Sequence, residues 1–284
     1  MRSIVLLVLG LSSVLVLDAH SQDLTIPKRK TIIVTSASGS LGRAVACSLA
    51  FDHDLILTGR NFKKLKDLKS ELTNSYQGRY EIRSLDFSNP TSRTDFGYYL
   101  KNNASHISGV VLITPRPMVN DTESVIPNED AWLNLFRVNI TGPLDTLKTI
   151  IPYLYPSSKI VIIAGTTSVQ LQPQYGFSCV VFRTWTTLTK ILSYRLGAFG
   201  ITVNALSPGV VLTKAHKERI LRQAGENGLS YEEQMRKETE NIPLHRHAET
   251  LDLTKAVGFL LSDQANFING INLVLDGGYT SVFH

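Results

Sequence analysis

From Lys30 onward the chain alternates short runs rich in β-branched residues with longer amphipathic segments, and no linker or repeat interrupts this pattern. A run as apolar as residues 160–163 (IVII) is typical of a strand buried on both faces, as in parallel sheets covered by helices. The pattern therefore predicts one α/β domain over residues 30–284, a doubly wound parallel sheet with helices on both faces. Seven strands are expected, at residues 31–35, 54–58, 80–85, 109–113, 159–164, 202–206 and 271–275.

A turn of small residues follows the first expected strand and leads into a helix that should begin near Arg43. A helix N-terminus offers unpaired N–H groups and the positive end of the helix dipole, which together suit the pyrophosphate of a dinucleotide. The residues expected to contact it are Thr35, Ser36, Ser38, Gly39, Ser40, Leu41 and Gly42.

Arg60 and Asn61 follow the second expected strand. Sites selective for NAD(H) place an acid here, which accepts hydrogen bonds from the ribose hydroxyls. An arginine supplies charge and paired donors that suit a 2′-phosphate instead. The sequence therefore favours NADP(H) over NAD(H), and the alternative is a surface arginine at the end of a strand.

Two distant segments, residues 204–213 (NALSPGVVLT) and 269–278 (NGINLVLDGG), occur in the order seen in short-chain dehydrogenases/reductases. Together with the turn they resemble that family over roughly residues 30–279, which implies a Rossmann-type fold that binds NAD(P). The resemblance implies that the nicotinamide end contacts Pro208, Gly209, Val211 and Thr213. It also implies that the adenosine end contacts Asp86, Phe87 and Thr114.

The sequence departs from the family pattern at two places in the cofactor region. Ser36 and Ser40 replace the first two glycines of the family's TGxxxGxG turn, while Gly42 keeps the third. After the fourth expected strand the family has Asn-Asn-Ala-Gly, whereas residues 113–116 read ITPR. A side chain in place of either glycine narrows the approach of a phosphate to the backbone.

The catalytic positions differ more strongly. The family uses a tyrosine as acid, a lysine that lowers its pKa, a serine that orients the substrate and an asparagine in a proton relay. Asn139 matches the asparagine, but Ser178, Phe182 and Gly165 stand at the tyrosine, lysine and serine positions. A serine hydroxyl is a far weaker acid than a phenol and phenylalanine carries no charge, so the ordinary mechanism is not expected here.

Two further resemblances bear on the chemistry. Tyr175 lies seven residues before Phe182, the interval between tyrosine and lysine in bacterial enoyl reductases, with Arg183 as a nearby cation. Ser178 and Arg183 also resemble a divergent 3-oxoacyl-acyl-carrier-protein-reductase-like branch of the family. One hypothesis is a reductase of a small carbonyl or enoyl substrate whose candidate catalytic residues are Asn139, Tyr175, Ser178 and Arg183. A second is a catalytically silent nucleotide-binding or scaffold protein, and a third is a protein whose turn no longer accepts a dinucleotide.

Composition and helix pattern indicate which partners to expect. The net charge of +5 is scattered, so no nucleic-acid partner is expected, and the two cysteines lack the spacing of a metal site. Residues 130–154 and 178–199 resemble the helices that pair in family dimers, which implies a homodimer or homotetramer. Residues 214–240 form a charged, helical-looking stretch that is either a substrate lid or a solvated hairpin.

The N-terminus carries an apolar run over residues 4–17, followed by a pattern typical of a signal-peptide cleavage site before Gln22. The run is shorter than the ~20 residues of a spanning helix. Residues 1–21 are therefore interpreted as a signal peptide, with a membrane anchor or a packed extension as alternatives. The positive charges of residues 28–30 (KRK) favour a domain on the cytoplasmic side of the membrane, and so does the need for cellular NADPH. The cellular location therefore stays open between export, membrane anchoring and the cytoplasmic side.

Overall fold

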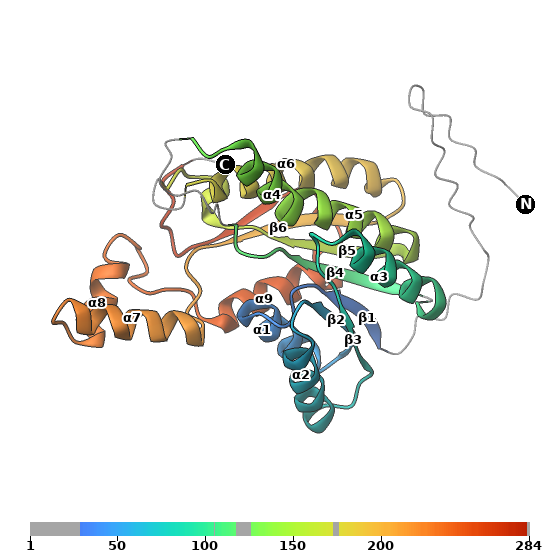
Figure 1. Ribbon diagram of the computed structural model, residues 1–284, viewed down its shortest axis with the longest axis horizontal. Coiled ribbons are helices and arrows are strands. Elements are labelled where there is room, and N and C mark those ends of the chain that lie inside the picture. The colour runs from blue at the N-terminus through green and yellow to red at the C-terminus, as the bar shows by residue number, and fades with distance from the viewer. Residues whose placement is uncertain (1–28, 105, 118–125, 173–175, 283–284) are drawn as a thin grey trace, which may run out of the picture.

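The computed structural model describes residues 29–104, 106–117, 126–172 and 176–282 (Figure 1). The predicted N-terminal segment 1–21 and the candidate Tyr175 lie outside them. Seven parallel strands form a sheet in the order β3-β2-β1-β4-β5-β6-β7, which confirms the predicted Rossmann-type α/β fold. The strands are β1 (Lys30–Val34), β2 (His53–Gly59), β3 (Tyr80–Ser84), β4 (Ile107–Ile113), β5 (Leu154–Ile163), β6 (Thr202–Pro208) and β7 (Asn272–Leu275).

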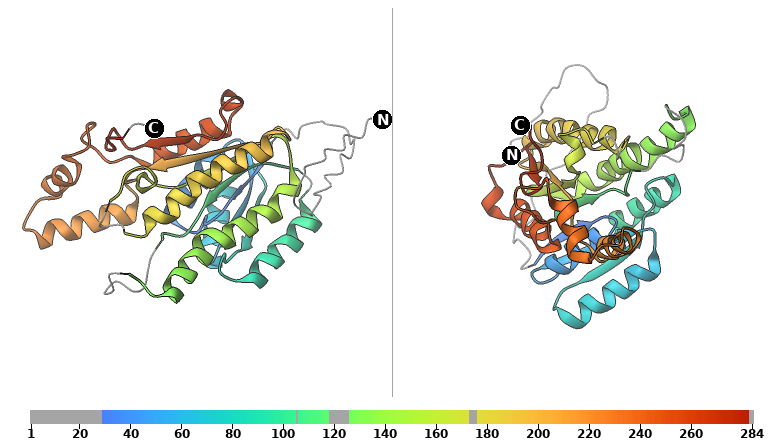
Figure 2. Two further views of the ribbon diagram at one scale, coloured as in Figure 1. Left: turned by 90° about the horizontal axis from the view of Figure 1, so that it is seen from above. Right: turned by 90° about the vertical axis from the view of Figure 1, so that its left-hand side faces the viewer.

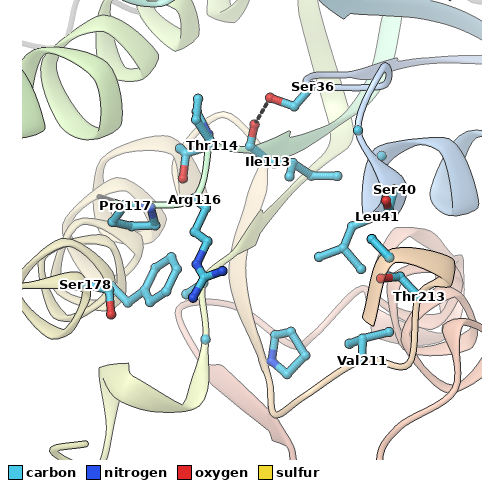
Figure 3. Close-up of a pocket in the computed structure, with 18 of the residues that line it drawn as sticks. Ser36, Ser40, Leu41, Ile113, Thr114, Arg116, Pro117, Ser178, Val211 and Thr213 are labelled. Atoms are coloured by element: carbon cyan, nitrogen blue, oxygen red, sulfur yellow. Dashed lines mark hydrogen bonds between the residues drawn. The ribbon is translucent and has the colours of Figure 1, made fainter. Parts of the chain in front are cut away.

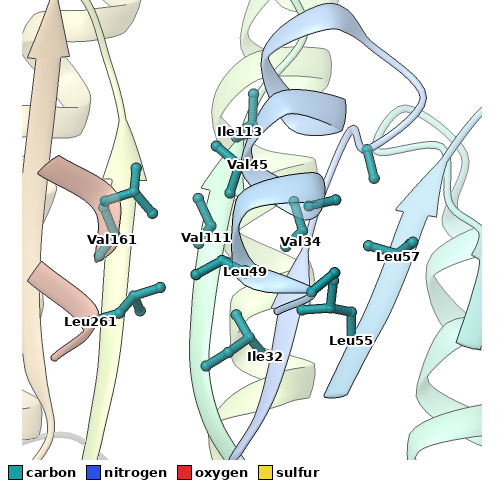
Figure 4. Close-up of a cluster of buried hydrophobic side chains, with 14 of the residues drawn as sticks. Ile32, Val34, Val45, Leu49, Leu55, Leu57, Val111, Ile113, Val161 and Leu261 are labelled. Carbon is teal, nitrogen blue, oxygen red and sulfur yellow. The ribbon is translucent and has the colours of Figure 1, made fainter. Parts of the chain in front are cut away.

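Helices cover both faces of the sheet because neighbouring side chains of each buried strand point to opposite sides (Figures 1 and 2). On β1, Ile32 and Val34 pack into one apolar cluster and Ile33 into the other. Figure 4 shows the first cluster, in which Val45 and Leu49 of the first helix meet strand residues. This face carries α1 (Ser40–Leu49), α2 (Phe62–Ser75) and α9 (Thr250–Leu261), and the other carries α3 (Pro90–Asn103), α4 (Glu129–Phe136), α5 (Gly142–Ile150) and α6 (Ser178–Gly197).

Short helical turns join several of these elements. The π-helical turn η1 (Arg137–Thr141) links α4 to α5, and the 3-10 turn η2 (Ile151–Tyr153) links α5 to β5. Two further 3-10 turns, η3 (Thr166–Ser168) and η5 (Asp263–Ala265), follow β5 and α9. Leu154 pairs with Ile107 ahead of a register shift, which explains why β5 begins earlier than the predicted residue 159.

The charged stretch after β6 forms two helices, α7 (Lys214–Glu226) and α8 (Tyr231–Thr239), as the pattern predicted. They lie beyond one end of the sheet (Figure 2). A capping box between Ser230 and Glu233 fixes the start of α8. Within the described part of the chain, no helix has the length and apolarity needed to cross a membrane.

Candidate functional site

A cavity of about 1050 Å³ opens at the carboxyl ends of the strands (Figure 3). Here β1 and β4 are neighbours whose following segments lead to opposite faces of the sheet, which is where doubly wound sheets bind ligands. Most of the residues that the sequence predicted lie together in its lining. These are Ser36, Ser38, Gly39, Ser40, Leu41, Gly42, Arg60, Asp86, Phe87, Thr114, Ser178, Pro208, Gly209, Val211 and Thr213.

The turn after β1 places a serine in a backbone conformation that favours glycine. Ser36 has φ of +50°, a region that glycine enters freely and other residues enter at a cost. Its hydroxyl donates to the carbonyl of Ile113 at 2.8 Å (Figure 3), which offsets that cost and joins β1 to β4.

The start of α1 differs from the sequence prediction. The helix begins at Ser40 and not near Arg43, because Arg43 already donates its N–H to the carbonyl of Gly39 at 2.9 Å. No side chain caps this end of the helix. Its first amides therefore remain for a ligand, as a phosphate-binding helix N-terminus requires.

Exchanging Ser36 for alanine should lower the free energy of unfolding by about 1 kcal/mol, because the bond to Ile113 is lost while the positive φ remains. Ser36→Gly should stay close to the wild type, since glycine avoids a backbone cost of about 1 kcal/mol. Denaturant unfolding of the three proteins measures both effects. Equal losses in the two variants would contradict this account of the turn.

Two predicted cofactor residues lie outside the cavity lining. Thr35 is fully buried; its hydroxyl donates to the Ile113 carbonyl at 2.9 Å and accepts from the Ile113 N–H at 2.8 Å. The side chain of Asn61 caps α2 by accepting from the N–H of Lys64 at 3.0 Å. Both residues position the cavity without lining it.

Several polar groups in the lining have no partner within the described residues. The hydroxyls of Thr58, Thr114 and Thr167 are buried and make no hydrogen bond. Arg60 is exposed and makes no hydrogen bond or ion pair within the described part of the chain. A buried polar group without a partner costs about 1–3 kcal/mol. The lining therefore fits a polar ligand of dinucleotide size.

The wall at the catalytic positions is apolar. Phe182 and Gly165 both line the cavity. A Cβ built on Gly165 would lie 3.0 Å from Cε2 of the Phe182 ring, so the ring fills the space that a serine side chain would need. Ser178, the first residue of α6, lines the same wall (Figure 3).

Asn139 lies in the π-helical turn η1 beside this wall, where only its neighbour Val138 reaches the cavity. The Asn139 side chain is buried and donates to the carbonyl of Leu135 at 3.2 Å. Its Oδ1 has no partner among the described residues. The indole N–H of Trp185 donates to the Asn139 main-chain carbonyl at 2.8 Å.

Arg183 also lies off the lining. Its guanidinium donates to the carbonyl of Ser168 at 2.8 Å, which ties α6 to η3. Of the four candidate catalytic residues, the structure places only Ser178 in the lining, and Tyr175 lies outside the described residues.

The prediction missed a charged group at the α7 side of the cavity. His216 and Arg219, one turn apart on α7, line the cavity. Arg219 donates to Glu238 of α8 at 2.8 Å, and the same nitrogen lies 2.9 Å from Nε2 of His216. His247 Nε2 lies 3.4 Å from the same carboxylate oxygen. One sequence signal could have identified them: His216 and Arg219 are three residues apart in a helical stretch that directly follows Thr213.

These contacts set the protonation states. Burial, then the charges of Arg219, His247 and Arg116, lower the pKa of His216 to about 4 against the opposing effect of Glu238. Burial also lowers the pKa of His247. Burial acts to raise the pKa of Glu238, but hydrogen bonds led by that from Arg219 hold it below its ordinary value. At neutral pH the group is therefore an arginine–glutamate pair with two neutral histidines.

The same three side chains have the spacing of a metal site, since ligand atoms of His216, Glu238 and His247 lie within 4.8 Å of one another. The guanidinium of Arg219 already pairs with the carboxylate and faces His216. It supplies the positive charge that a metal ion would bring, so the cluster is interpreted as an ion-pair network.

Comparisons with known proteins place the chain among reductases. A family model described as Enoyl-(Acyl carrier protein) reductase matches residues 36–280. The 3-oxoacyl-acyl-carrier-protein reductase FabG of Rickettsia felis is 29% identical over 265 residues, covering 89% of this chain and 98% of the relative. FabG of Staphylococcus epidermidis is 26% identical over 254 residues, covering 88% and 98%.

A solved structure has the same fold. L-sorbose reductase from Gluconobacter frateurii, complexed with NADPH and L-sorbose, matches with a TM-score of 0.81 at 17% identity. The match covers 90% of this chain and 98% of that one. At this identity the likeness concerns the fold alone.

Proposed function

Because the chain belongs to the short-chain dehydrogenase/reductase family, in its 3-oxoacyl-acyl-carrier-protein-reductase-like branch, we propose that it is an NADP(H)-dependent reductase with a non-standard active site. Its substrate would be a small carbonyl compound or an activated alkene. The observation that carries the cofactor choice is Arg60, exposed and unpaired among the described residues at the cavity rim. The relatives' names and the NADPH in the sorbose reductase structure support it.

The cavity offers a place for each part of the dinucleotide. The amides of residues 40–42 would hold the pyrophosphate at the start of α1, whereas the Gly39 N–H already donates to the carbonyl of Ser36 at 2.9 Å. Asp86 would accept from the adenine amino group; its carboxylate is held by the N–H and hydroxyl of Ser88 at 2.9 and 2.7 Å. Thr213 and the backbone from Pro208 would hold the nicotinamide end. When bound, the cofactor supplies the hydride.

The protein must then deliver a proton to the oxygen or carbon that becomes negative. The hydroxyl of Ser178 can orient the substrate oxygen from the wall of the cavity. Phe182 supplies no charge, so the proton is assigned to Tyr175 or to an ordered water, with Asn139 as its relay. Arg183 would act as a positioning residue through its bond to Ser168.

A second function, a catalytically silent nucleotide-binding protein, is favoured by one observation. The Phe182 ring fills the space beside Gly165, so an apolar pair replaces the lysine and serine of the ordinary site. A panel of ketones and enones, tested with the NADPH-loaded protein, separates the two. Turnover of any compound supports the reductase, and binding without turnover across the panel supports the silent protein.

Exchanging Arg60 for alanine tests the cofactor assignment. We expect the affinity for NADPH to fall about 10- to 100-fold, the value of a charge-assisted pair with the 2′-phosphate, while the affinity for NADH stays unchanged. Fluorescence titration measures both. Lys63→Ala removes an exposed cation of α2 that lies off the cavity lining and should leave both affinities unchanged. Equal losses of NADPH and NADH in Arg60→Ala would remove the preference for NADP(H).

The homodimer or homotetramer stays a prediction. It is supported by exposed apolar side chains on α4 and α6, such as Leu133, Ile191 and Tyr194. The cellular location stays a prediction as well, because it depends on residues 1–21.

A further inference from the structure

Arg116 is an arginine of the cavity lining to which the proposed function gives no role. It follows the carboxyl end of β4, lines the cavity and is exposed. Among the described residues, it has no hydrogen bond or ion pair. Arg219 by contrast is held by Glu238 and faces His216, and Arg60 is assigned to the 2′-phosphate. Arg116 therefore presents an unneutralised charge to the cavity.

The position of Arg116 separates it from the phosphate site. In Figure 3 its side chain reaches into the cavity on the side of Thr114 and Ser178, away from Ser40 and Leu41 at the start of α1. The start of α1 is the proposed site of the cofactor pyrophosphate. The guanidinium thus faces the part of the cavity where the substrate would meet the wall that carries Ser178.

The charges around this part of the cavity favour an anion. Asp86 is the sole acid among the described lining residues, and it belongs to the adenine side after β3. His216 is neutral, and the positive charge of Arg116 is one cause of its lowered pKa, so the two groups interact across the cavity. With Nε2 facing the Arg219 donor, the His216 ring carries its proton on Nδ1 and can donate a hydrogen bond.

We propose that Arg116 binds a carboxylate of the substrate, so that the protein acts on small oxo or enoic acids and not on neutral ketones. A guanidinium presents two parallel donors that match the two oxygens of a carboxylate. The inference rests on the proposed function, because it names the substrate of that same cavity. The alternative source of negative charge, the cofactor pyrophosphate, is an outcome of the test.

The test compares an acid with its neutral ester. Levulinate and methyl levulinate, and crotonate and methyl crotonate, are titrated into the wild type, Arg116→Gln and Arg222→Gln by ligand-observed NMR, with and without NADPH. Arg222 is a matched control, an α7 arginine whose side chain is 67% exposed and lies off the lining. The wild type and Arg222→Gln should prefer each acid about tenfold or more, the range of a charge-assisted pair, and Arg116→Gln should lose that preference.

A second measurement follows the His216 ring by NMR. Bound carboxylate neutralises Arg116 and should raise the pKa of His216 in the wild type but not in Arg116→Gln. Equal binding of acid and ester by the wild type, or binding of neither, overturns the proposal. So does a loss of NADPH affinity in Arg116→Gln, which would assign the arginine to the cofactor. NADPH titration of the wild type decides the proposed function, and the acid–ester comparison without cofactor decides this inference separately.

Discussion

Exchanging Gly42 for alanine should reduce the affinity for NADPH at least about 100-fold, the effect of misplacing a set of phosphate-binding amides. The new Cβ would overlap the carbonyl oxygen of Ser36 and lie 2.8 Å from Cα of Ala37. Both are backbone atoms, so no side chain can rotate aside. Either the turn or the start of α1 must move, and the amides then lose their common direction. The same strain should lower the free energy of unfolding by about 1–3 kcal/mol.

The matched control is Gly258→Ala in the C-terminal half of α9, where a Cβ would meet nothing within 4 Å. Alanine there should stabilise the protein by about 0.5–1 kcal/mol and leave NADPH affinity unchanged. Affinities are measured by fluorescence titration at a temperature where circular dichroism shows all proteins folded. Wild-type affinity in Gly42→Ala would remove the turn from the cofactor site.

The second large effect is a loss of stability in mild acid. His216 titrates near 6.5 in an unfolded chain and at about 4 in the folded protein. Between these values the unfolded chain binds the proton and the folded protein does not, so stability falls as pH drops through 6.5 and stops falling below about 4. At ~1.4 kcal/mol per pH unit the upper limit is ~3 kcal/mol. About pH 5 lies roughly 1.5 units below 6.5, so the expected loss there is ~2 kcal/mol, and a side chain only 18% exposed is little screened by solvent.

Denaturant unfolding at about pH 7.5 and about pH 5 measures this loss in the wild type, His216→Gln and His106→Gln. The pH-dependent loss should shrink by ~2 kcal/mol in His216→Gln. His106, an exposed histidine away from α7 and α8, serves as the control and should leave it unchanged. An unchanged loss in His216→Gln would show that burial and the neighbouring charges do not lower the pKa of His216 in the folded protein.

The fold could be predicted because an apolar run bounded by turns indicates a buried strand, whichever elements later pack against it. The direction in which a side chain points could not be predicted in this way. Thr35 and Asn61 stand at the expected points of the chain, yet one faces β4 and the other caps α2. Arg183 likewise turns to Ser168 and not to the cavity. Spacing along the chain gives a residue's place on an element, whereas local hydrogen bonds decide where its polar end goes.

Contacts between different helices and strands could not be predicted from the sequence either, because they depend on how these elements pack. Arg219 and Glu238 are 19 residues apart and meet because α7 and α8 fold back on each other. Arg116 was visible as a departure after the fourth strand, but its direction into the cavity was not. Both features depend on packing that no periodicity encodes.

The close packing of the Phe182 ring against Gly165 limits which substitutions can restore the ordinary catalytic residues of the family. A serine at position 165 would press against the ring while the ring remains, and a lysine at position 182 would have no hydroxyl partner at 165 while the glycine remains. Neither single replacement restores the lysine–serine pair of the family, so an engineered return to it requires both substitutions in one step.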